Sequence, residues 1–294
     1  MIFRPNYMQA IKEFKDKPLV KILTGVRRCG KSTIFLMLKE ELIKEGASEE
    51  DIIEKRYTDM DIPENITAKQ MYDELIEAIG DKKHCYLLLD EIQEVSDWER
   101  AVNNLLECGK ADIYITGSNS KLMSSEISTY LTGRYIQIPV FTLSFQEYMG
   151  FKEDSRKSKT ELLEEYIRFG GFPIIALEEY EPQQAYQIVN GIYYTVVSRD
   201  IVKRHRINKQ DLFDRVVKYI IENVGKTFSA NSISNFLKSE HRKVSVESIY
   251  NYLRWLEQAF IIYPCARYDL QRKNILKTQE KYYFSDVSLK YALL

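Results

Sequence analysis

The chain has 294 residues, of which 45% are hydrophobic and 29% are charged. This is enough apolar material for about two domains, and with only 12 Gly and 7 Pro it excludes a disordered or collagen-like chain. The longest apolar runs, 86–89 and 259–263, are far shorter than a membrane span, and no apolar signal sequence follows Met1. We therefore expect a cytoplasmic protein with no membrane partner. Four scattered cysteines and three histidines show no metal-ligand spacing, so we expect no zinc site.

The net charge of −1 hides an asymmetry along the chain. Residues 199–294 hold 18 Lys and Arg against 10 Asp and Glu, whereas the first 198 residues hold 24 against 33. A basic C-terminal third could face an acidic partner such as nucleic acid, or it could dock on the acidic front part of the same chain. Composition leaves both interpretations open.

The first half of the sequence alternates short apolar runs with helix-like stretches. The pattern predicts strands over 19–26, 52–58, 85–89, 112–116 and 135–140, and helices over 31–45, 68–79 and 98–106. Strands that are buried on both faces and separated by helices imply a parallel α/β sheet, because parallel strands need crossover connections. We therefore predict a three-layer α/β core over residues 1–144.

The second half changes character. Helical patterns dominate until about residue 260, and they predict a small helical domain over 145–206 with helices at 145–151, 160–169 and 182–204. The last segment, 207–294, predicts three helices followed by two strands, over 211–223, 231–239, 246–260, 261–268 and 281–284. This is the element order of a winged helix-turn-helix domain.

The clearest motif occupies residues 25–32, which read Gly-Val-Arg-Arg-Cys-Gly-Lys-Ser and match the P-loop pattern G-x-x-x-x-G-K-[ST] in full. Glycines let the backbone turn so that its N–H groups surround phosphates, Lys31 reaches the β and γ oxygens, and the Ser32 hydroxyl ligates Mg²⁺. The competing interpretation is a Gly-rich surface turn, but the motif follows a predicted strand and opens a predicted helix. The candidate nucleotide-binding residues are Gly25, Arg27, Arg28, Cys29, Gly30, Lys31, Ser32 and Thr33.

A second element follows the buried run 86–89, where Asp90 and Glu91 stand at the carboxyl end of a strand. Asp90 could hold Mg²⁺, and Glu91 could orient and deprotonate an attacking water. Alone, such a pattern most often marks only a strand end. A P-loop about sixty residues upstream favours the functional interpretation.

A third strand ends in a polar tip at residues 117–119. Asn119 or Ser118 could sense the γ-phosphate or hold the water, or these residues could cap a helix, which Ser and Asn favour strongly. The sequence does not decide between the two roles.

With these elements placed, the chain resembles the AAA-like P-loop ATPases of bacteria and archaea that carry an Arg-Arg-x-Gly-Lys-Ser/Thr P-loop and a C-terminal winged helix. The resemblance spans nearly the whole chain and rests on the stretches 25–33, 88–93, 97–99, 116–118, 131–135, 143–145, 170–173 and 283–286. It implies that the strand ending at Thr116 lies between the P-loop strand and the strand ending at Asp90.

Three further roles are implied by this resemblance. Pro173 would lie against the adenine, although its Gly-Gly-x-Pro context also suits a turn between helices. Arg134 would act as an arginine finger, in its own chain or from a neighbouring copy, the alternative being a surface salt bridge. Arg199 would be a second sensor of the nucleotide.

In the predicted winged helix, residues 245–254 would form the recognition helix. The residues left for a DNA groove or its phosphates are Ser245, Ser248, Asn251 and Arg254, with Arg242 and Lys243, and the wing would offer Arg272, Lys273 and Lys277. Glu247, Glu257 and the modest positive charge do not suit tight DNA binding. Winged helices also serve as lids and dimer contacts, so DNA and a second copy of the chain are both candidate partners.

These observations lead us to expect a Mg²⁺-dependent ATPase that couples ATP hydrolysis to rearrangement of a helical lid and a winged helix. Lys31, Glu91, Asn119 and Arg134 are the candidate catalytic residues, and Ser32 and Asp90 are the candidate metal ligands. The alternative is a nucleotide-gated DNA- or protein-binding switch with little turnover. A small-molecule kinase is disfavoured, because kinases of this fold seldom pair the strand-end acid with a Glu poised for water.

Overall fold

The computed structural model describes residues 2–63, 65–118, 130–205, 207, 209–242, 244–269 and 274–294. The chain divides into two compact units, of which the first comprises Met1–Gly25 and Cys29–Val140 and the second comprises Val26–Arg28 and Phe141–Leu294. Three P-loop residues therefore belong to the second unit. Within the described ranges, no helix combines the length and the apolar character needed to cross a bilayer.

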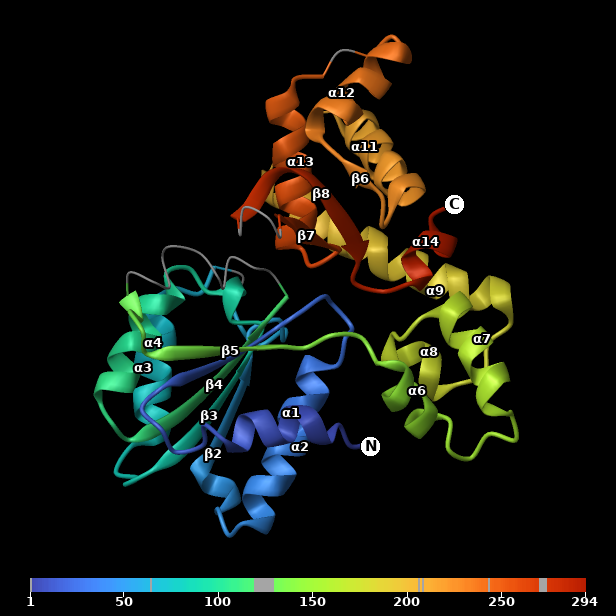
Figure 1. Cartoon of the computed structure of the whole chain (residues 1–294). Coiled ribbons are helices and arrows are strands. Elements are labelled where there is room, and N and C mark those ends of the chain that lie inside the picture. Colours follow the sequence, from blue (N-terminus) through green and yellow to red (C-terminus); the bar gives the residue numbers. More distant parts are fainter. Residues whose placement is uncertain are drawn as a thin grey trace. The chain divides into compact units, whose positions relative to one another are not determined.

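The first unit is built on a five-stranded parallel sheet (Figure 1). The strand order is β2-β3-β4-β1-β5, so β4 lies between β1 and β3, which confirms the order that the resemblance implies. β1 and β3 are buried at every position, as expected for central parallel strands. The strands are β1 (Val20–Thr24), β2 (Ile52–Arg56), β3 (Cys85–Asp90), β4 (Ala111–Gly117) and β5 (Tyr135–Pro139).

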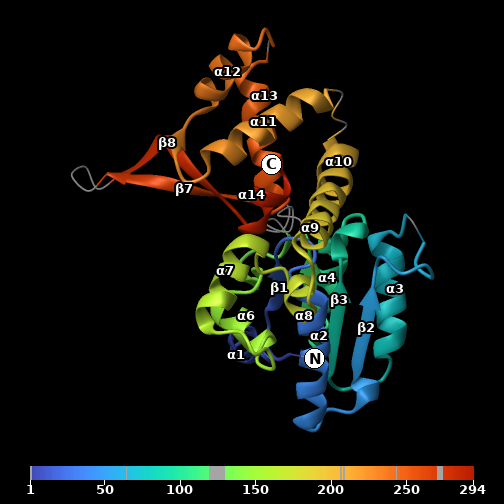
Figure 2. The same cartoon turned by 90° about the vertical axis from the view of Figure 1, so that its right-hand side faces the viewer.

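Helices cover both faces of this sheet, which confirms the predicted three layers. Figures 1 and 2 show α3 and α4 on one face and α1 and α2 on the other. Buried side chains of α3 and α4, among them Leu75 and Leu105, pack with strand residues such as Leu87 and Ile115 in one apolar cluster. The apolar pattern of the sequence does not predict α1, whose described residues bury only Met8 and Ile11. The helices are α1 (Pro5–Lys12), α2 (Lys31–Lys44), α3 (Ala68–Ile79) and α4 (Trp98–Glu107), with short 3₁₀ turns η1 (Glu49–Asp51) and η2 (Ile92–Glu94).

The second unit begins with a run of helices. Both α6 and α7 start at a capping box, in which Ser144 pairs with Glu147 and Ser158 pairs with Glu161. The sequence predicts one helix over 182–204, whereas the structure has a π-helical segment that interrupts it. The elements are α6 (Phe145–Phe151), α7 (Lys159–Phe169), α8 (Pro173–Leu177), α9 (Pro182–Val196), the π-helical η4 (Val197–Val202) and α10 (Lys203–His205).

The rest of the second unit contains three longer helices and a small antiparallel sheet of order β6-β8-β7. Its apolar faces are strongly buried, with Phe213, Ile233 and Ile249 completely covered. The short β6 and α14 are additions to the predicted elements, and the separation of this segment from the preceding helices as its own domain stays a prediction. The elements are α11 (Gln210–Asn223), β6 (Thr227–Phe228), α12 (Ala230–Ser239), α13 (Val246–Gln258), β7 (Ile262–Asp269), β8 (Asn274–Phe284) and α14 (Ser288–Ala292).

A buried carboxylate fastens the C-terminal segment to the turn before α8. Asp286 is 3% exposed and accepts hydrogen bonds from the backbone N–H of Gly171 at 2.8 Å and of Ser288 at 3.0 Å. Gly170 has φ +79°, and a Cβ atom there would lie 1.8 Å from the Asp286 carboxylate oxygen. Glycine is required at this position because the carboxylate fills the space that a side chain would take.

Candidate nucleotide-binding site

The P-loop joins β1 to α2 and has the backbone of a phosphate-binding turn. Gly25 has φ +150°, and a Cβ there would lie 2.1 Å from the Val140 carbonyl oxygen. Arg28 and Gly30 also have positive φ, at +65° and +103°. Gly30 precedes α2, and no side chain caps the N-terminus of this 14-residue helix. The first N–H groups of a helix lack intrahelical partners, so this end is suited to an anion.

Lys31 supplies the cation at this turn. Lys31 is only 4% exposed, and its ammonium group donates to the Gly25 carbonyl oxygen at 2.8 Å. The side chain therefore contacts the first residue of the P-loop. Arg4, which is also buried, donates to the Cys29 carbonyl oxygen at 2.9 Å and thereby holds the backbone of the P-loop. Sequence reasoning missed Arg4 because it lies far from the motif in the chain.

Two acidic residues stand beside the P-loop at the carboxyl edge of the sheet. Asp90 ends β3 and is 5% exposed. The Thr116 hydroxyl, at the end of β4, donates to Asp90 Oδ1 and accepts the backbone N–H of Glu91 at 3.0 Å. The neighbouring strand therefore orients both acids, a role that the sequence did not predict for Thr116.

Glu91 itself is held in an unusual conformation. Its φ of +54° is left-handed, which is rare for a residue other than glycine and recurs at functional sites. Its Oε2 atom accepts hydrogen bonds from Gln93 Nε2 and from the Ser118 hydroxyl, the latter at 3.2 Å. Ser118, which belongs to the predicted polar tip, is fully buried in contact with this carboxylate.

A hollow of about 240 Å³ lies next to these residues and is lined by Ser32, Asp90, Arg56 and Asp59, among others. Arg56 ends β2 and its Nε atom lies 3.2 Å from Asp90 Oδ2. Register places Arg56 directly opposite Asp90 in the sheet. The guanidinium is half exposed, so this ion pair is weak and can open for a metal ion.

Asn119 lies outside the described residues. Pro173 occupies the first turn of α8, and the flanking Gly171 carbonyl accepts the N–H of Leu143 at 2.7 Å. Thr33 and Arg28 are exposed at the P-loop. Arg199 is exposed on η4.

Arg134 lies away from its own P-loop. It precedes β5, and its carbonyl oxygen accepts the N–H of Val20 at 2.9 Å, at the amino end of β1. Its guanidinium contacts Asn103 at 2.6 Å and Glu107 at 3.3 Å. Because the P-loop follows the carboxyl end of β1, the structure does not bring Arg134 to the phosphate site of its own chain. As an arginine finger, Arg134 would therefore act on the nucleotide of a neighbouring copy of the chain.

A residue that the sequence analysis did not single out meets the P-loop arginine within the second unit. Asp200 on η4 is 2% exposed, and its two oxygens accept from Arg27 Nε at 2.7 Å and Arg27 Nη2 at 3.0 Å. This is a bidentate, largely buried ion pair. No local pattern indicated it, since the two residues are 173 positions apart.

Known proteins similar to this chain also indicate an AAA-like P-loop core. An uncharacterized protein of Haemophilus influenzae is 35% identical over 294 residues, which cover 99% of this chain and 73% of that protein. The chain belongs to the same family as this protein. Residues 17–149 match the family model of an AAA domain, and residues 160–294 match a domain of unknown function, DUF8612. The first unit thus has an AAA-like P-loop core, as the sequence motifs predict.

An archaeal relative and a solved structure are also similar to this chain. The uncharacterized protein MJ1544 of Methanocaldococcus jannaschii is 34% identical over 87% of this chain, which spans only 58% of that protein. The Walker-type ATPase PABY2304 of Pyrococcus abyssi has a similar fold, with a TM-score of 0.67, 14% identity and coverage of 100% of this chain and 96% of that one. At this identity the likeness shows a shared fold alone.

Proposed function

We propose that this AAA-domain protein binds and hydrolyses ATP with Mg²⁺. The observation that carries the proposal is the uncapped N-terminus of α2, bordered by the glycines of the P-loop and by the buried Lys31, beside the acids that end β3. A triphosphate fits this arrangement because it supplies the negative charge that the helix end and the lysine attract.

Each P-loop residue then has a defined role. Lys31 exchanges its bond to the Gly25 carbonyl for phosphate oxygens. The Ser32 hydroxyl and the Asp90 carboxylate both line the hollow described above and would hold Mg²⁺, Asp90 through water. When bound, Mg²⁺ neutralises charge on the β and γ oxygens. The backbone of Gly25, Arg27, Arg28, Cys29, Gly30 and Thr33 would surround the phosphates.

Glu91 is the proposed general base. It would take a proton from the water that attacks the γ-phosphorus, while the bond to the β,γ-bridging oxygen breaks and ADP leaves with the electron pair. Its backbone N–H donates to the Thr116 hydroxyl, and its carboxylate accepts a hydrogen bond from the Ser118 hydroxyl. These two contacts fix the position of Glu91 before the substrate binds. Such prior placement is what lets a base act efficiently.

Three other assignments complete the proposed site. Asn119 would sense the γ-phosphate, Pro173 would contact the adenine, and Arg134 would reach the γ-phosphate of a second copy of the chain. The position of Arg134 at the opposite edge of the sheet supports the intermolecular form of this role, and with it a homo-oligomer.

We further propose that the nucleotide state controls the second unit, including a helical lid and a winged helix formed by α11, α12, α13, β7 and β8. The Arg27–Asp200 ion pair supports this link, because a triphosphate that attracts Arg27 would compete with the Asp200 carboxylate. The order of three helices followed by an antiparallel hairpin supports the winged helix.

A nucleotide-gated switch that binds DNA or protein is the second candidate. A specific observation favours it: Ser248, Asn251 and Trp255 of α13 line a hollow of about 310 Å³ together with Lys209 and His205. The His205 ring stacks on Trp255 with 4.3 Å between ring centroids. Polar, cationic and aromatic groups around one hollow suit nucleic acid.

Phosphate release from ATP separates the two candidates. An ATPase would release phosphate with Mg²⁺, and Glu91→Gln would slow release by about two to four decades while leaving ATP bound. The matched control is Glu94→Gln, three residues further along and exposed, which should turn over like the wild type. Tight ATP binding with almost no release by the wild type, with or without duplex DNA, would favour the switch. Unchanged turnover in Glu91→Gln would remove the base role of Glu91.

A further inference from the structure

Gln93 forms a closed group of hydrogen bonds with the proposed base. Its amide nitrogen donates to Glu91 Oε2 and lies 3.4 Å from the Ser118 hydroxyl, which itself donates to the same carboxylate oxygen at 3.2 Å. Gln93 lies in η2, the turn that follows the left-handed Glu91. One oxygen of the Glu91 carboxylate is therefore occupied by two donors, and these contacts leave Oε1 as the acceptor for a proton.

The other end of the same amide is also informative. Gln93 Oε1 is buried, and the residues that the structure describes offer it no hydrogen-bond partner. A buried acceptor without a partner is destabilising, and such groups in native proteins usually meet water or a reactant. Because the amide nitrogen is fixed on Glu91, its oxygen lies beside the carboxylate that would hold the attacking water.

We propose that Gln93 is part of the water-holding machinery of this ATPase. Its N–H group fixes Glu91 Oε2, and its amide oxygen accepts one hydrogen of the water while Glu91 takes the other as the proton that is lost. The water oxygen bonds to the γ-phosphorus, the bond to the bridging oxygen breaks, and ADP carries away the electron pair. This inference rests on the proposed hydrolysis of ATP.

A purely structural role for Gln93 has different consequences. If its amide only braced η2, replacing it would weaken every nucleotide complex to the same extent. If it holds the water, the loss appears only where the water takes part. Two ADP complexes make this distinction: aluminium fluoride imitates the planar phosphoryl group with water in line, and beryllium fluoride imitates the γ-phosphate before attack.

The test compares the wild type with Gln93→Met, which keeps the length of the side chain and removes both polar atoms. The variant should turn over about 10- to 100-fold more slowly. Its affinity for ADP with aluminium fluoride should fall at least tenfold, whereas its affinity for ADP with beryllium fluoride should stay within about threefold. Gln183→Met, on an exposed position of α9, is the matched control and should behave like the wild type.

Equal losses for the two fluoride complexes, or unchanged turnover, would overturn the role of Gln93 alone. Should Gln93→Met fail to fold, Gln93→Asn keeps an amide but withdraws it by one methylene, and the same selective loss is expected. A wild type that binds neither complex would instead overturn the proposed ATPase activity and this inference with it.

Discussion

At the scale of single residues, Gly25 is the position with the least freedom in the P-loop. It combines a positive φ with the Val140 carbonyl 2.1 Å from the place of a Cβ atom. Gly25→Ala should therefore lower the unfolding free energy by about 2–4 kcal/mol, since the backbone of two segments must separate. Urea denaturation measures this difference.

Gly46→Ala provides the matched control for this substitution. Gly46 also has a positive φ, +103°, but nothing lies within 4 Å of the place of its Cβ. We expect a loss of about 1 kcal/mol, from backbone strain alone. Equal losses for the two variants would show that the close approach to Val140 has no energetic weight.

Asp286 should make stability depend on pH in an uncommon direction. Complete burial raises the pKa of this carboxyl, while hydrogen bonds from Ser288 and Gly171 oppose the rise. A pKa above the unfolded value means that the folded protein binds the proton more tightly, so this contribution to stability is present below about pH 4 and is lost as pH rises through the folded pKa.

Asp286→Asn removes this titration. The unfolding free energy of the wild type minus that of the variant should fall as pH rises from about 4 to 7, by at most about 1.4 kcal/mol per pH unit. Denaturant titrations of both proteins at several pH values measure the difference. A difference that rises over the same range would contradict a raised pKa.

The sequence predicted the residues whose chemistry is encoded by short spacing. The P-loop forms one such local pattern, at the turn between a strand and a helix, and Asp90 and Glu91 form a second one, at the end of a buried strand. Gln93 and Arg56 could not be found in this way, since their roles depend on side-chain rotamers and on the register of β2 against β3. Ser118 was predicted as a polar tip, but its contact with Glu91 comes from the packing of β4 on β3.

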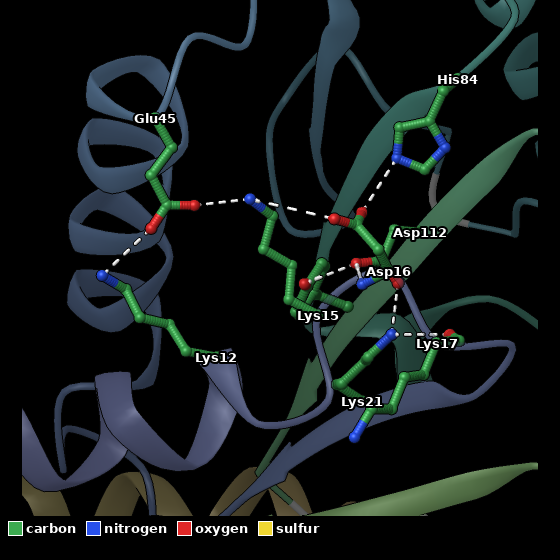
Figure 3. A network of polar contacts seen from close by, with 9 residues as sticks. Lys12, Lys15, Asp16, Lys17, Lys21, Glu45, His84 and Asp112 are labelled. Carbon is green, nitrogen blue, oxygen red and sulfur yellow. Dashed lines mark hydrogen bonds and ion pairs between the residues drawn. The ribbon is translucent and has the colours of Figure 1, made fainter.

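At the scale of elements, β1 and β4 carry a charged network inside the sheet (Figure 3). Lys21 and Asp112 are 0% and 3% exposed and form an ion pair, and Asp112 Oδ2 accepts the Tyr114 hydroxyl at 2.6 Å. Burial lowers the pKa of Lys21, although Asp112 opposes this effect. Asp112 also accepts the backbone N–H of Asp16 at 2.9 Å, so the network fixes the segment that leads into β1.

Lys21→Met should leave Asp112 buried without its cation and cost about 3–5 kcal/mol of unfolding free energy. The double variant Lys21→Met, Asp112→Leu should recover part of this loss, because no unpaired charge remains. Lys12, drawn beside Glu45 in the same figure, is exposed and pairs with Glu41 and Glu45. It is the control, and Lys12→Met should change stability little. A Lys21→Met loss as small as that of Lys12→Met would refute the structural weight of this pair.

The elements also show where periodicity fails as a guide. The strands and most helices follow their apolar patterns, and the family resemblance implied the position of β4 between β1 and β3. The helix predicted over 182–204 is interrupted by the π-helical η4. The sequence did not predict this interruption, because hydrophobic spacing does not distinguish helix types. α1 and α14 bury too few residues to produce a clear period.

At the scale of the whole molecule, the Arg27–Asp200 pair joins residues that are distant in the chain but belong to the same compact unit. The side chains are 13% and 2% exposed, so removal of Arg27 leaves a buried charge. Arg27→Ala should therefore cost about 3–5 kcal/mol of unfolding free energy. The loss in the double variant with Asp200→Ala should be smaller than the sum of the single losses by more than about 1 kcal/mol. Strict additivity in denaturant titrations would show that the two residues do not interact in solution.

Long-range pairs of this kind explain why the sequence alone predicted the organisation of the molecule only in part. The AAA-like core followed from local motifs, whereas the link between the P-loop and η4 depends on how distant segments fold together. The three-domain division and the winged helix remain proposals for the same reason.

Equilibrium binding of a fluorescent ATP analogue to the purified protein with Mg²⁺ tests whether the P-loop holds a nucleotide. We predict saturable binding by the wild type, a loss of at least about 100-fold in affinity for Lys31→Ala, and no loss for Lys44→Ala at the exposed far end of the same helix. No binding by the wild type, or equal affinities for the two lysine variants, would contradict this prediction.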